Sequence, residues 1–343
     1  LAELSEALNT FHGVRHSSRY WRILVGPWLG YFTQMLFDRW TTIQRAVRDY
    51  KIAGTAVLDL PPEQLIPNDK AHFDKLFVND LWNHAIYGRI LNGWTNVSCE
   101  RVPVQKLAEG PPAHAYIVPI PWKRRLQRVG ARGLSILSRV LSRPTDAFFI
   151  SSYLPLGKDF QLQLALGQAP KLWRSSSPPQ VAPDLRVRQQ FRLPGNDFKG
   201  FEGCVRSLIS EQIPTLYLEG YRTLQTVIAK LPWPKRPRVI FTSNNYNSDD
   251  IFKAWASTKT ESGSPLIIGQ HGGHYGSGLW NYTEEHEYAI ADRYLTWGWT
   301  EGKPKQYPVG ALKLSGRGPS VWDPDGGILL VTAVAPRYSY WMY

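Results

Sequence analysis

The sequence predicts an α/β fold in which a parallel sheet is covered by helices on both faces. Short apolar runs typical of buried strands recur along the chain, as at residues 239–243 and 266–268. Stretches with apolar residues at helical spacing separate these runs. Residues 265–299 contain the pattern once in full: apolar strand, glycine-rich loop, helix and second strand. Open α/β sheets build sites in this way, at the carboxyl ends of their strands.

The other elements follow from the same patterns. Helices are expected at residues 4–11, 31–50, 71–94, 160–166, 201–230 (interrupted at Pro214), 251–259 and from 283 onward. Further strands are expected at residues 19–25, 55–60, 148–152 and 293–297. Irregular segments are expected at residues 175–194 and 304–326, which are rich in proline, glycine and serine, and a polar turn at residues 244–248.

The composition indicates a folded chain with an anionic partner. The 343 residues are 43% hydrophobic and carry a formal net charge of +12. This excess favours an acidic membrane face, an acidic or nucleotide-linked substrate, or nucleic acid. No helix-turn-helix, RNP or zinc-finger pattern appears, so nucleic acid is not expected. Two cysteines are too few for a disulfide framework, which favours a reducing cytoplasm, and no apolar run is long enough to predict a membrane span.

Residues 123–143 are predicted to form a basic amphipathic helix. The segment has seven basic residues and no acidic one, and its apolar residues recur at intervals of three and four. One interpretation is a core helix with a solvated basic face. The other is contact with an acidic membrane surface.

The glycine loop carries the best candidates for chemistry. Its two histidines, His271 and His274, suit acid–base catalysis or the binding of an anion, because imidazole titrates near neutrality. A metal site would need further ligands such as Glu284 or Glu285, and no HExxH spacing is present. A structural role, in which the histidines hold the turn by hydrogen bonds, is the alternative.

The glycines do not form a phosphate-binding motif of the Walker or GxGxxG type. Gly272, Gly273 and Tyr275 are nevertheless candidate substrate contacts, because glycines let a backbone approach a ligand. The acids in the first turn of the following helix are Glu284, Glu285 and Glu287. They either cap that helix, or one of them acts as a base or binds sugar hydroxyls. Thr283 is its expected cap, and His286 is a further candidate for substrate binding.

Two other clusters are candidates for ligand binding. Arg15, Arg19 and Arg22 would form an arginine-lined wall beside the glycine loop, suited to a carboxylate or diphosphate. Asp38 either pairs with a nearby arginine or serves as a base. The last cluster comprises Asn244 and Asn245, at the end of a predicted strand. These residues either contact a ligand or form an ordinary turn.

Three stretches together resemble a known family. They are residues 19–40 (RYWRILVGPWLGYFTQMLFDRW), residues 241–255 (FTSNNYNSDDIFKAW) and residues 268–299, which begin IGQHGGHYGSGLWN. They are similar to predicted transferases encoded in bacterial O-antigen and capsule gene clusters. The last stretch is also distantly similar to the HG loops of capsule Kdo transferases and of polyol-phosphate polymer transferases.

The resemblance implies a GT-B-like architecture, with two Rossmann-like domains and an active site in the cleft between them. Residues 1–303 would form the acceptor-side domain, residues 304–326 a linker and residues 327–343 the first strand of a truncated donor-nucleotide domain. We therefore expect the natural protein to extend beyond both ends of this chain. The family's HGG core falls on His271, Gly272 and Gly273, and its EEHE segment contains Glu285 and His286.

The implied function is that of a glycosyltransferase of bacterial surface-polysaccharide biosynthesis that needs no bound metal. It would act in the cytoplasm or at the inner face of the cytoplasmic membrane, on an oligosaccharide or lipid-linked acceptor. An acidic sugar of the octulosonate or nonulosonate type, linked to CMP, is the first candidate donor. We expect His271 to assist the attacking or departing oxygen and Glu285 or Asp38 to act as base. The alternatives are a CDP-polyol phosphotransferase and a non-enzymatic basic module that binds membranes or nucleic acid.

Overall fold

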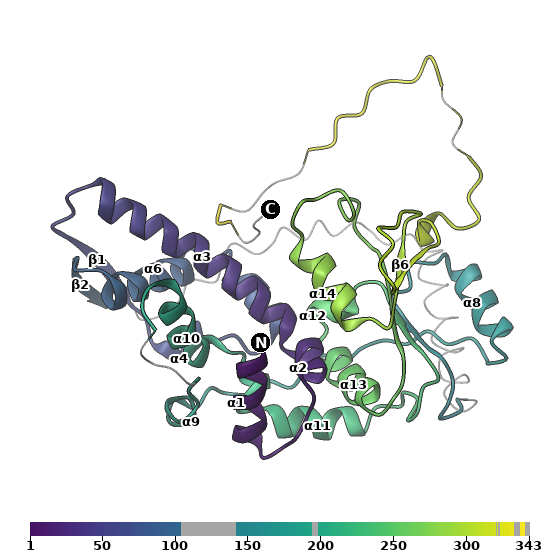
Figure 1. Cartoon of the computed structure of the whole chain (residues 1–343), viewed down its shortest axis with the longest axis horizontal. Helices are drawn as coiled ribbons and strands as arrows, with labels where there is room; N and C mark the ends of the chain where they lie inside the picture. Colours follow the sequence, from purple (N-terminus) through teal and green to yellow (C-terminus); the bar gives the residue numbers. More distant parts are fainter. Residues whose placement is uncertain (104–141, 194–197, 320, 322, 333–336, 340–343) are drawn as a thin grey trace, which may run out of the picture.

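The computed structural model describes residues 1–103, 142–193, 198–319, 321, 323–332 and 337–339. The basic helix expected at residues 123–143 lies almost entirely outside these residues. Within them, parallel sheets are flanked by helices, which confirms the predicted α/β class (Figure 1). In the described part of the chain, no helix is long and apolar enough to cross a membrane.

Three helices open the chain: α1 (Ala2–His12), α2 (Ser18–Leu24) and α3 (Gly26–Asp49). The strand expected at residues 19–25 is wrong, because these residues form α2. Ser17 caps α2 by accepting a hydrogen bond from the backbone of Tyr20. The apolar residues of this segment are buried at helical rather than alternating spacing, and they are Tyr20, Trp21, Ile23 and Leu24.

A small parallel sheet lies at one end of the molecule, beside the far end of α3 (Figure 1). It pairs β1 (Gly54–Asp59) with β2 (Ser98–Pro103), and α6 (Asp80–Trp94) packs on it. Two shorter helices, α4 (Pro62–Leu65) and α5 (Lys70–Leu76), precede α6. The single helix expected at residues 71–94 is thus two helices, because Asn79 caps a new one at Asp80. The strand at residues 98–103 was not predicted.

The main sheet has five parallel strands in chain order: β3 (Phe148–Ile150), β4 (Ile240–Thr242), β5 (Leu266–Gly269), β6 (Arg293–Thr296) and β7 (Gln306–Pro308). All neighbours pair in parallel register. Strand β7 and the short 3-10 helix η2 (Leu312–Leu314) fall inside residues 304–326, which were expected to be irregular.

The segment between β3 and β4 folds into α8 (Leu156–Ala165), α9 (Leu185–Gln190), α10 (Gly200–Gln212), the 3-10 helix η1 (Thr215–Tyr217) and α11 (Tyr221–Ala229). Helices α12 (Asn245–Ser248) and α13 (Asp250–Glu261) connect β4 to β5, and α14 (Tyr282–Ile290) connects β5 to β6. Helix α9 lies within residues 175–194, for which no helix was expected, and α12 replaces the expected polar turn.

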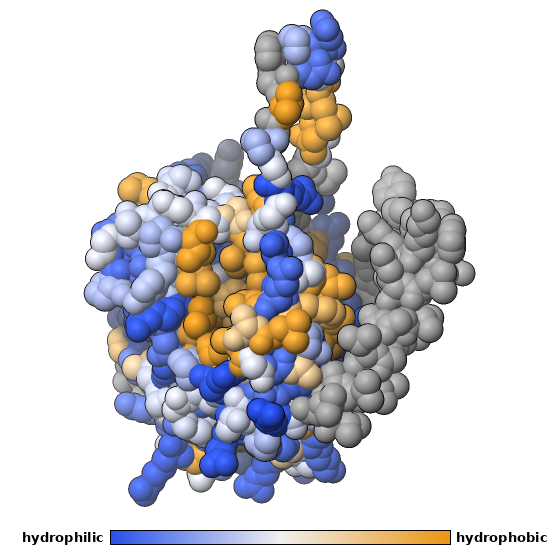
Figure 2. Space-filling view, turned by 90° about the vertical axis from the view of Figure 1, so that its right-hand side faces the viewer, coloured by the Kyte–Doolittle hydropathy of each residue, from blue (hydrophilic) through white to orange (hydrophobic). Residues whose placement is uncertain are grey.

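The two faces of the main sheet differ in their covering. Alternate strand residues such as Ile240 and Ile268 belong to the large core formed with the helices. Phe149 and Phe241 point to the other face and belong to a smaller cluster, against which Leu312 packs. The side of the molecule that carries α8 and the β7 edge exposes apolar side chains (Figure 2), and those on α8 are Leu156, Leu162 and Leu164.

Residues 327–332 are exposed and form no strand in the structure. The division of the chain into an acceptor-side domain, a linker and a donor-nucleotide domain remains a prediction.

Candidate functional site

The residues that follow the strands of the main sheet form a polar edge. Tyr153 lies after β3, Asn244 after β4 and His271 after β5. Asn244 Nδ2 donates to the Tyr153 hydroxyl at 2.8 Å, and the Tyr153 and His271 rings lie edge to face at 6.4 Å. Ser151 and Tyr153 hold φ angles of 47° and 62°, which cost free energy in residues other than glycine. Strained backbone thus coincides with the edge at which parallel sheets bind ligands.

Gln270 fixes the start of the glycine loop. Its Oε1 accepts from Trp299 Nε1 at 2.8 Å, and its Nε2 donates to Gly272 O at 2.7 Å. Further along, Gly276 has a φ of 75°, and a Cβ there would lie 2.7 Å from the Trp299 ring. The Gly276 N–H donates to Glu284 Oε2 at 2.9 Å. These contacts anchor the loop to α14 and to the segment after β6, and so set the position of the histidines it carries.

Glu287 is a fully buried carboxyl group on α14 that faces His271. Its Oε1 lies 3.4 Å from His271 Nδ1, and 25% of the His271 side chain is exposed. Nδ1 is buried and has no hydrogen bond within the described residues. A proton on Nδ1 would therefore point at the carboxyl group and leave Nε2 as an acceptor on the accessible side of the ring. An imidazole held by a carboxyl group in this way suits proton transfer.

Three tyrosines enclose the same carboxyl group. The Tyr275 hydroxyl donates to Glu287 Oε1 at 2.6 Å, and the Tyr246 hydroxyl donates to the same oxygen. Tyr294 is buried close by, but its hydroxyl makes no hydrogen bond to the described residues. Burial first, and then the charge of Glu287, raise the pKa of all three tyrosines. Their hydroxyls therefore stay protonated at neutral pH, and two of them hold the carboxyl group in place.

Lys313 brings a cation to the polar edge. Its Nζ lies 5.9 Å from the centre of the Tyr153 ring and 5.3 Å from that of Trp297. No carboxylate forms an ion pair with Lys313 in the part of the chain that the structure describes. An imidazole and an uncompensated ammonium group at one sheet edge can accommodate an anion such as a phosphate.

A cavity of about 580 Å³ lies between the start of α3 and the start of α14. Its lining includes Arg22, Glu285 and His286, together with Trp280 at the end of the glycine loop. The Trp280 side chain is 65% exposed, which is unusual for so large an apolar group. An exposed indole, an arginine and a carboxyl group around one cavity can bind a ligand with both polar and apolar surfaces.

Two glycines allow α3 and α14 to approach closely. A Cβ at Gly26 would lie 2.7 Å from His286 Cε1, and one at Gly30 would lie 1.7 Å from Tyr282 Cζ. The Tyr282 hydroxyl donates to Gly26 O at 2.5 Å. The spacing of four residues places both glycines on the same face of α3. Side chains of α14 fill the space that a side chain at either glycine would occupy.

His286 lies in the core more than in the cavity, since it is only 3% exposed. Its ring packs near those of Tyr246 and Tyr282, at 5.8 Å from each. Burial lowers the pKa of His286 to about 3, with smaller contributions from the charges of Arg22 and Lys253. His286 is therefore neutral at physiological pH, and we assign it a packing role at the wall of the cavity.

The arginines predicted to form one wall lie in three places. Arg22 lines the cavity between α3 and α14. Arg19 Nη2 donates to Ile290 O at 2.6 Å and to Asp292 Oδ2 at 2.7 Å, beyond the end of α14. Arg15 is exposed and lines a separate hollow near the start of α2. Of the three, only Arg22 is placed to contact a ligand beside the glycine loop.

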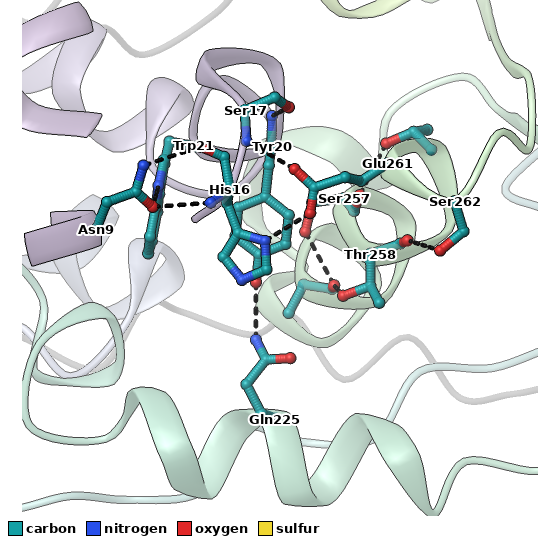
Figure 3. A network of polar contacts seen from close by, with 12 residues as sticks. Asn9, His16, Ser17, Tyr20, Trp21, Gln225, Ser257, Thr258, Glu261 and Ser262 are labelled. Carbon is teal, nitrogen blue, oxygen red and sulfur yellow. Dashed lines mark hydrogen bonds and ion pairs between the residues drawn. The ribbon is translucent and has the colours of Figure 1, made fainter. Parts of the chain in front are cut away.

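A polar network fixes α2 against the end of α13 (Figure 3). His16 Nδ1 lies 2.5 Å from Glu261 Oε2, and the Ser17 N–H donates to Glu261 Oε1 at 2.6 Å. Asn9 Oδ1 accepts from the His16 N–H at 3.0 Å, and the His16 ring stacks on that of Tyr20 at 3.8 Å. These contacts hold in place the helix that carries the second and third of the predicted arginines.

Asp38 is not near the glycine loop. It pairs with Arg39 at 2.9 Å and lies eight residues after Gly30, or about 12 Å further along α3. Asn245 is also engaged elsewhere, because its Nδ2 donates to Asp249 Oδ2 at 2.6 Å. The predicted residues that the structure does bring to the carboxyl edge and its loop are His271, Gly272, Gly273, His274, Tyr275 and Asn244.

Sequence reasoning overlooked the residue that organises this site. In the sequence, Glu287 is only one of several acids in the predicted first turn of a helix. The helix begins at Tyr282, and its cap is Asn281 rather than Thr283, because Asn281 Oδ1 accepts from two backbone N–H groups. Position 287 then shares the buried stripe of Thr283 and Ile290, and a carboxyl group in such a stripe is a signal of function. Tyr153, Tyr246 and Lys313 carried no comparable signal.

Among the residues that the structure describes, no group of three or more histidine, cysteine, aspartate or glutamate side chains is arranged to hold a metal ion. A family model described as "LIC12162 family transferase" matches residues 1–343. No curated protein and no solved structure matches the chain.

Proposed function

The chain belongs to the LIC12162 family of transferases, and we propose that it transfers a sugar from a nucleotide-linked donor to a hydroxyl group of a growing surface polysaccharide. The observation that carries this proposal is the contact of 3.4 Å between His271 and the buried Glu287. It supplies a proton acceptor at the carboxyl edge of a parallel sheet, where transfer to a hydroxyl requires one.

In the proposed reaction, His271 Nε2 takes the proton of the acceptor hydroxyl. The acceptor oxygen forms a bond to the anomeric carbon of the donor sugar, and the bond between that carbon and the donor phosphate oxygen breaks. The phosphate leaves with the electron pair, and the products are a glycoside and a nucleotide. Glu287 stabilises the imidazolium that forms, because opposite charges attract strongly where water is excluded.

The surrounding groups suit the two substrates. Lys313 supports the negative charge that develops on the departing phosphate. The cavity lined by Arg22, Glu285 and Trp280 is the proposed position of the acceptor, because an exposed indole and polar groups match the two kinds of surface on a saccharide. Glu285 is exposed and would bind acceptor hydroxyls, or serve as the base if the acceptor lies entirely in this cavity.

The finer assignments extend the same proposal. The donor is a CMP-linked acidic sugar, no bound metal takes part, and the acceptor is an oligosaccharide or a lipid-linked glycan. The protein acts in the cytoplasm, at the inner face of the membrane. The net charge of +12 supports an anionic donor and an anionic surface alike.

A thermal-shift screen of the full-length natural protein against CMP, CDP, UDP, GDP and their sugars tests the donor assignment. A ligand that binds the folded state raises the melting temperature by mass action, by an amount that grows with its concentration. We expect one nucleotide class to raise it, with CMP as the first candidate. If no nucleotide raises it, the nucleotide-linked donor is wrong.

A further inference from the structure

A second cavity is lined by residues of α4, α6, α9 and α10. Figure 1 shows these helices in the half of the molecule that holds the small sheet of β1 and β2, with α14 in the other half. Its volume is about 570 Å³, within the usual range for small-molecule sites. Helix α3 contacts α6 and α10, and it also contacts α14. None of the residues proposed for transfer lines it.

Gln212 points to a missing ligand. It is the last residue of α10, lines the cavity and is only 3% exposed. Its Oε1 is buried and accepts no hydrogen bond from any described residue. A buried acceptor that receives no hydrogen bond destabilises the folded protein. Such atoms are therefore rare unless a water molecule or a ligand donates to them. A hydroxyl group of a ligand in the cavity would do so.

The lining of the cavity contains four arginines and one carboxyl group. One of the arginines, Arg206, pairs with Glu3 and Glu202, which lie outside the lining. Arg188 is fully engaged, since it donates twice to Glu219, at 2.7 Å and 2.9 Å. Arg89 makes a looser ion pair, at 3.4 Å, with Glu211, and both of these side chains are partly exposed. Arg192 is exposed and pairs with no carboxylate in the described ranges of the chain. The two less engaged arginines are therefore available to an anion.

Aromatic surface completes the site. Trp94 and Phe198 both line the cavity, and 44% of Phe198 is exposed. The backbone at Phe198 passes close to α10 at Gly203, because a Cβ on residue 203 would lie only 2.1 Å from Phe198 O. Arg206 covers one face of the Phe198 ring at 4.2 Å. A sugar ring can pack on a single aromatic surface of this kind.

We propose that this cavity binds an anionic saccharide, with its acidic group on Arg192 and Arg89 and one of its hydroxyls donating to Gln212 Oε1. The inference goes beyond the proposed transfer reaction and does not depend on it. A carboxylate or a phosphate on the sugar would suit the same arginines. Each anion has two oxygens that can accept two parallel hydrogen bonds from one guanidinium group.

Isothermal titration calorimetry of the whole protein with three probes tests the proposal. The probes are trigalacturonate, which carries carboxylates, glucose 1-phosphate, which carries a phosphate, and maltotriose, which is neutral. We expect at least one anionic probe to bind at least tenfold more tightly than maltotriose, and the better of the two identifies the acidic group. Equal binding of all three probes, or binding of none, would overturn the proposal.

Variants locate the binding. Gln212→Leu removes the acceptor and Arg192→Met removes the cation, and each should weaken the preferred probe by about tenfold, the effect of one hydrogen bond or exposed ion contact of about 1.4 kcal/mol. Arg186→Met is the matched control, because Arg186 is an exposed arginine on α9 that does not line the cavity. Arg192 is exposed as well, so its variant tests the site even if Gln212→Leu fails to fold.

The His271→Ala variant separates this proposal from the transfer reaction. It should bind the probe as tightly as the natural protein does, whether or not it still transfers sugar. If binding is lost in His271→Ala and kept in Arg192→Met, the probe occupies the glycine-loop site and the second site is wrong.

Discussion

His271 Nδ1 and Glu287 Oε1 lie 3.4 Å apart, across the space between the glycine loop and α14. The imidazole comes from the end of β5 and the carboxyl group from the buried face of the next helix. Two tyrosine hydroxyls hold the carboxyl group in place. This contact defines which nitrogen of the His271 ring faces the protein and which faces a substrate.

Glu287→Gln should reduce transfer by roughly 10- to 1,000-fold while leaving the size of the side chain unchanged, because the amide cannot stabilise an imidazolium. Glu287 is a positioning residue, so its effect should depend on His271. In a double-mutant cycle, Glu287→Gln should have little further effect on a His271→Ala background.

The matched control for this substitution is Glu63→Gln, an exposed carboxyl group on α4, which should leave the rate unchanged. Fully additive losses in the two single variants would show that Glu287 acts independently of His271. The melting temperature of each variant distinguishes loss of activity from loss of fold.

His286 should make the protein less stable in acid. Burial lowers the pKa of His286 in the folded state from 6.5 to about 3. Between these two pH values the His286 side chain is protonated in the unfolded chain and neutral in the folded one. The stabilisation is complete above pH 6.5 and is lost as the pH falls from there toward 3, by about 1.4 kcal/mol per unit. On going from pH 7 to pH 5, His286 should lower the free energy of unfolding by about 2 kcal/mol. Urea unfolding of the natural protein and of His286→Gln at both pH values measures the difference, and equal losses in both would contradict the assignment.

Gly30→Ala should destabilise the fold by roughly 1–3 kcal/mol or more, because the added methyl group overlaps the Tyr282 ring. The same change in a Tyr282→Ala background should be nearly neutral. Gly93→Ala is the control, since no atom of the described residues lies within 4 Å of its Cβ position in α6. It should raise stability by up to about 1 kcal/mol. Equal effects at the two glycines in urea unfolding would show that α3 and α14 are not packed as described.

Asp250→Asn should be strongly destabilising. Asp250 Oδ1 lies 2.8 Å from Lys253 Nζ and accepts from the Tyr217 hydroxyl at 2.5 Å, and both members of the ion pair are fully buried. Removing the charge of Asp250 leaves a buried ammonium group uncompensated, at a cost of about 3–5 kcal/mol in the free energy of unfolding. Adding Lys253→Met should recover part of the loss. The exposed pair of Asp49 gives the control, since Asp49→Asn should change stability by less than about 0.5 kcal/mol.

The fold could be predicted from the sequence where strands are apolar and helices are amphipathic. Strands β3 to β6 and helix α13 were expected within a few residues of their observed bounds. Helix α2 was not, because its four buried residues occupy positions that also fit a buried strand, and the cap at Ser17 decides between the two. Strand β7 is three residues long and mostly exposed, so it has no apolar pattern to detect.

The site was predictable only in part, for a related reason. A glycine loop that directly follows an apolar strand is expected at the carboxyl edge of the sheet. His271 does lie there, after the end of β5. The partner of His271 depends on which face of α14 is buried against the glycine loop, and this is set by tertiary packing that the sequence pattern does not show. Asp38 illustrates the opposite error: it is near Arg22 in sequence, but the long helix α3 carries it away from the loop.

The central claim is that His271 is the proton acceptor in sugar transfer. The most direct measurement is the rate at which nucleotide is released from the donor, with acceptor present, by the natural protein and by His271→Ala and His271→Gln at equal concentration and melting temperature. We expect the rate to fall by about 10²- to 10⁴-fold in both variants. Release at the natural rate in His271→Ala would contradict it.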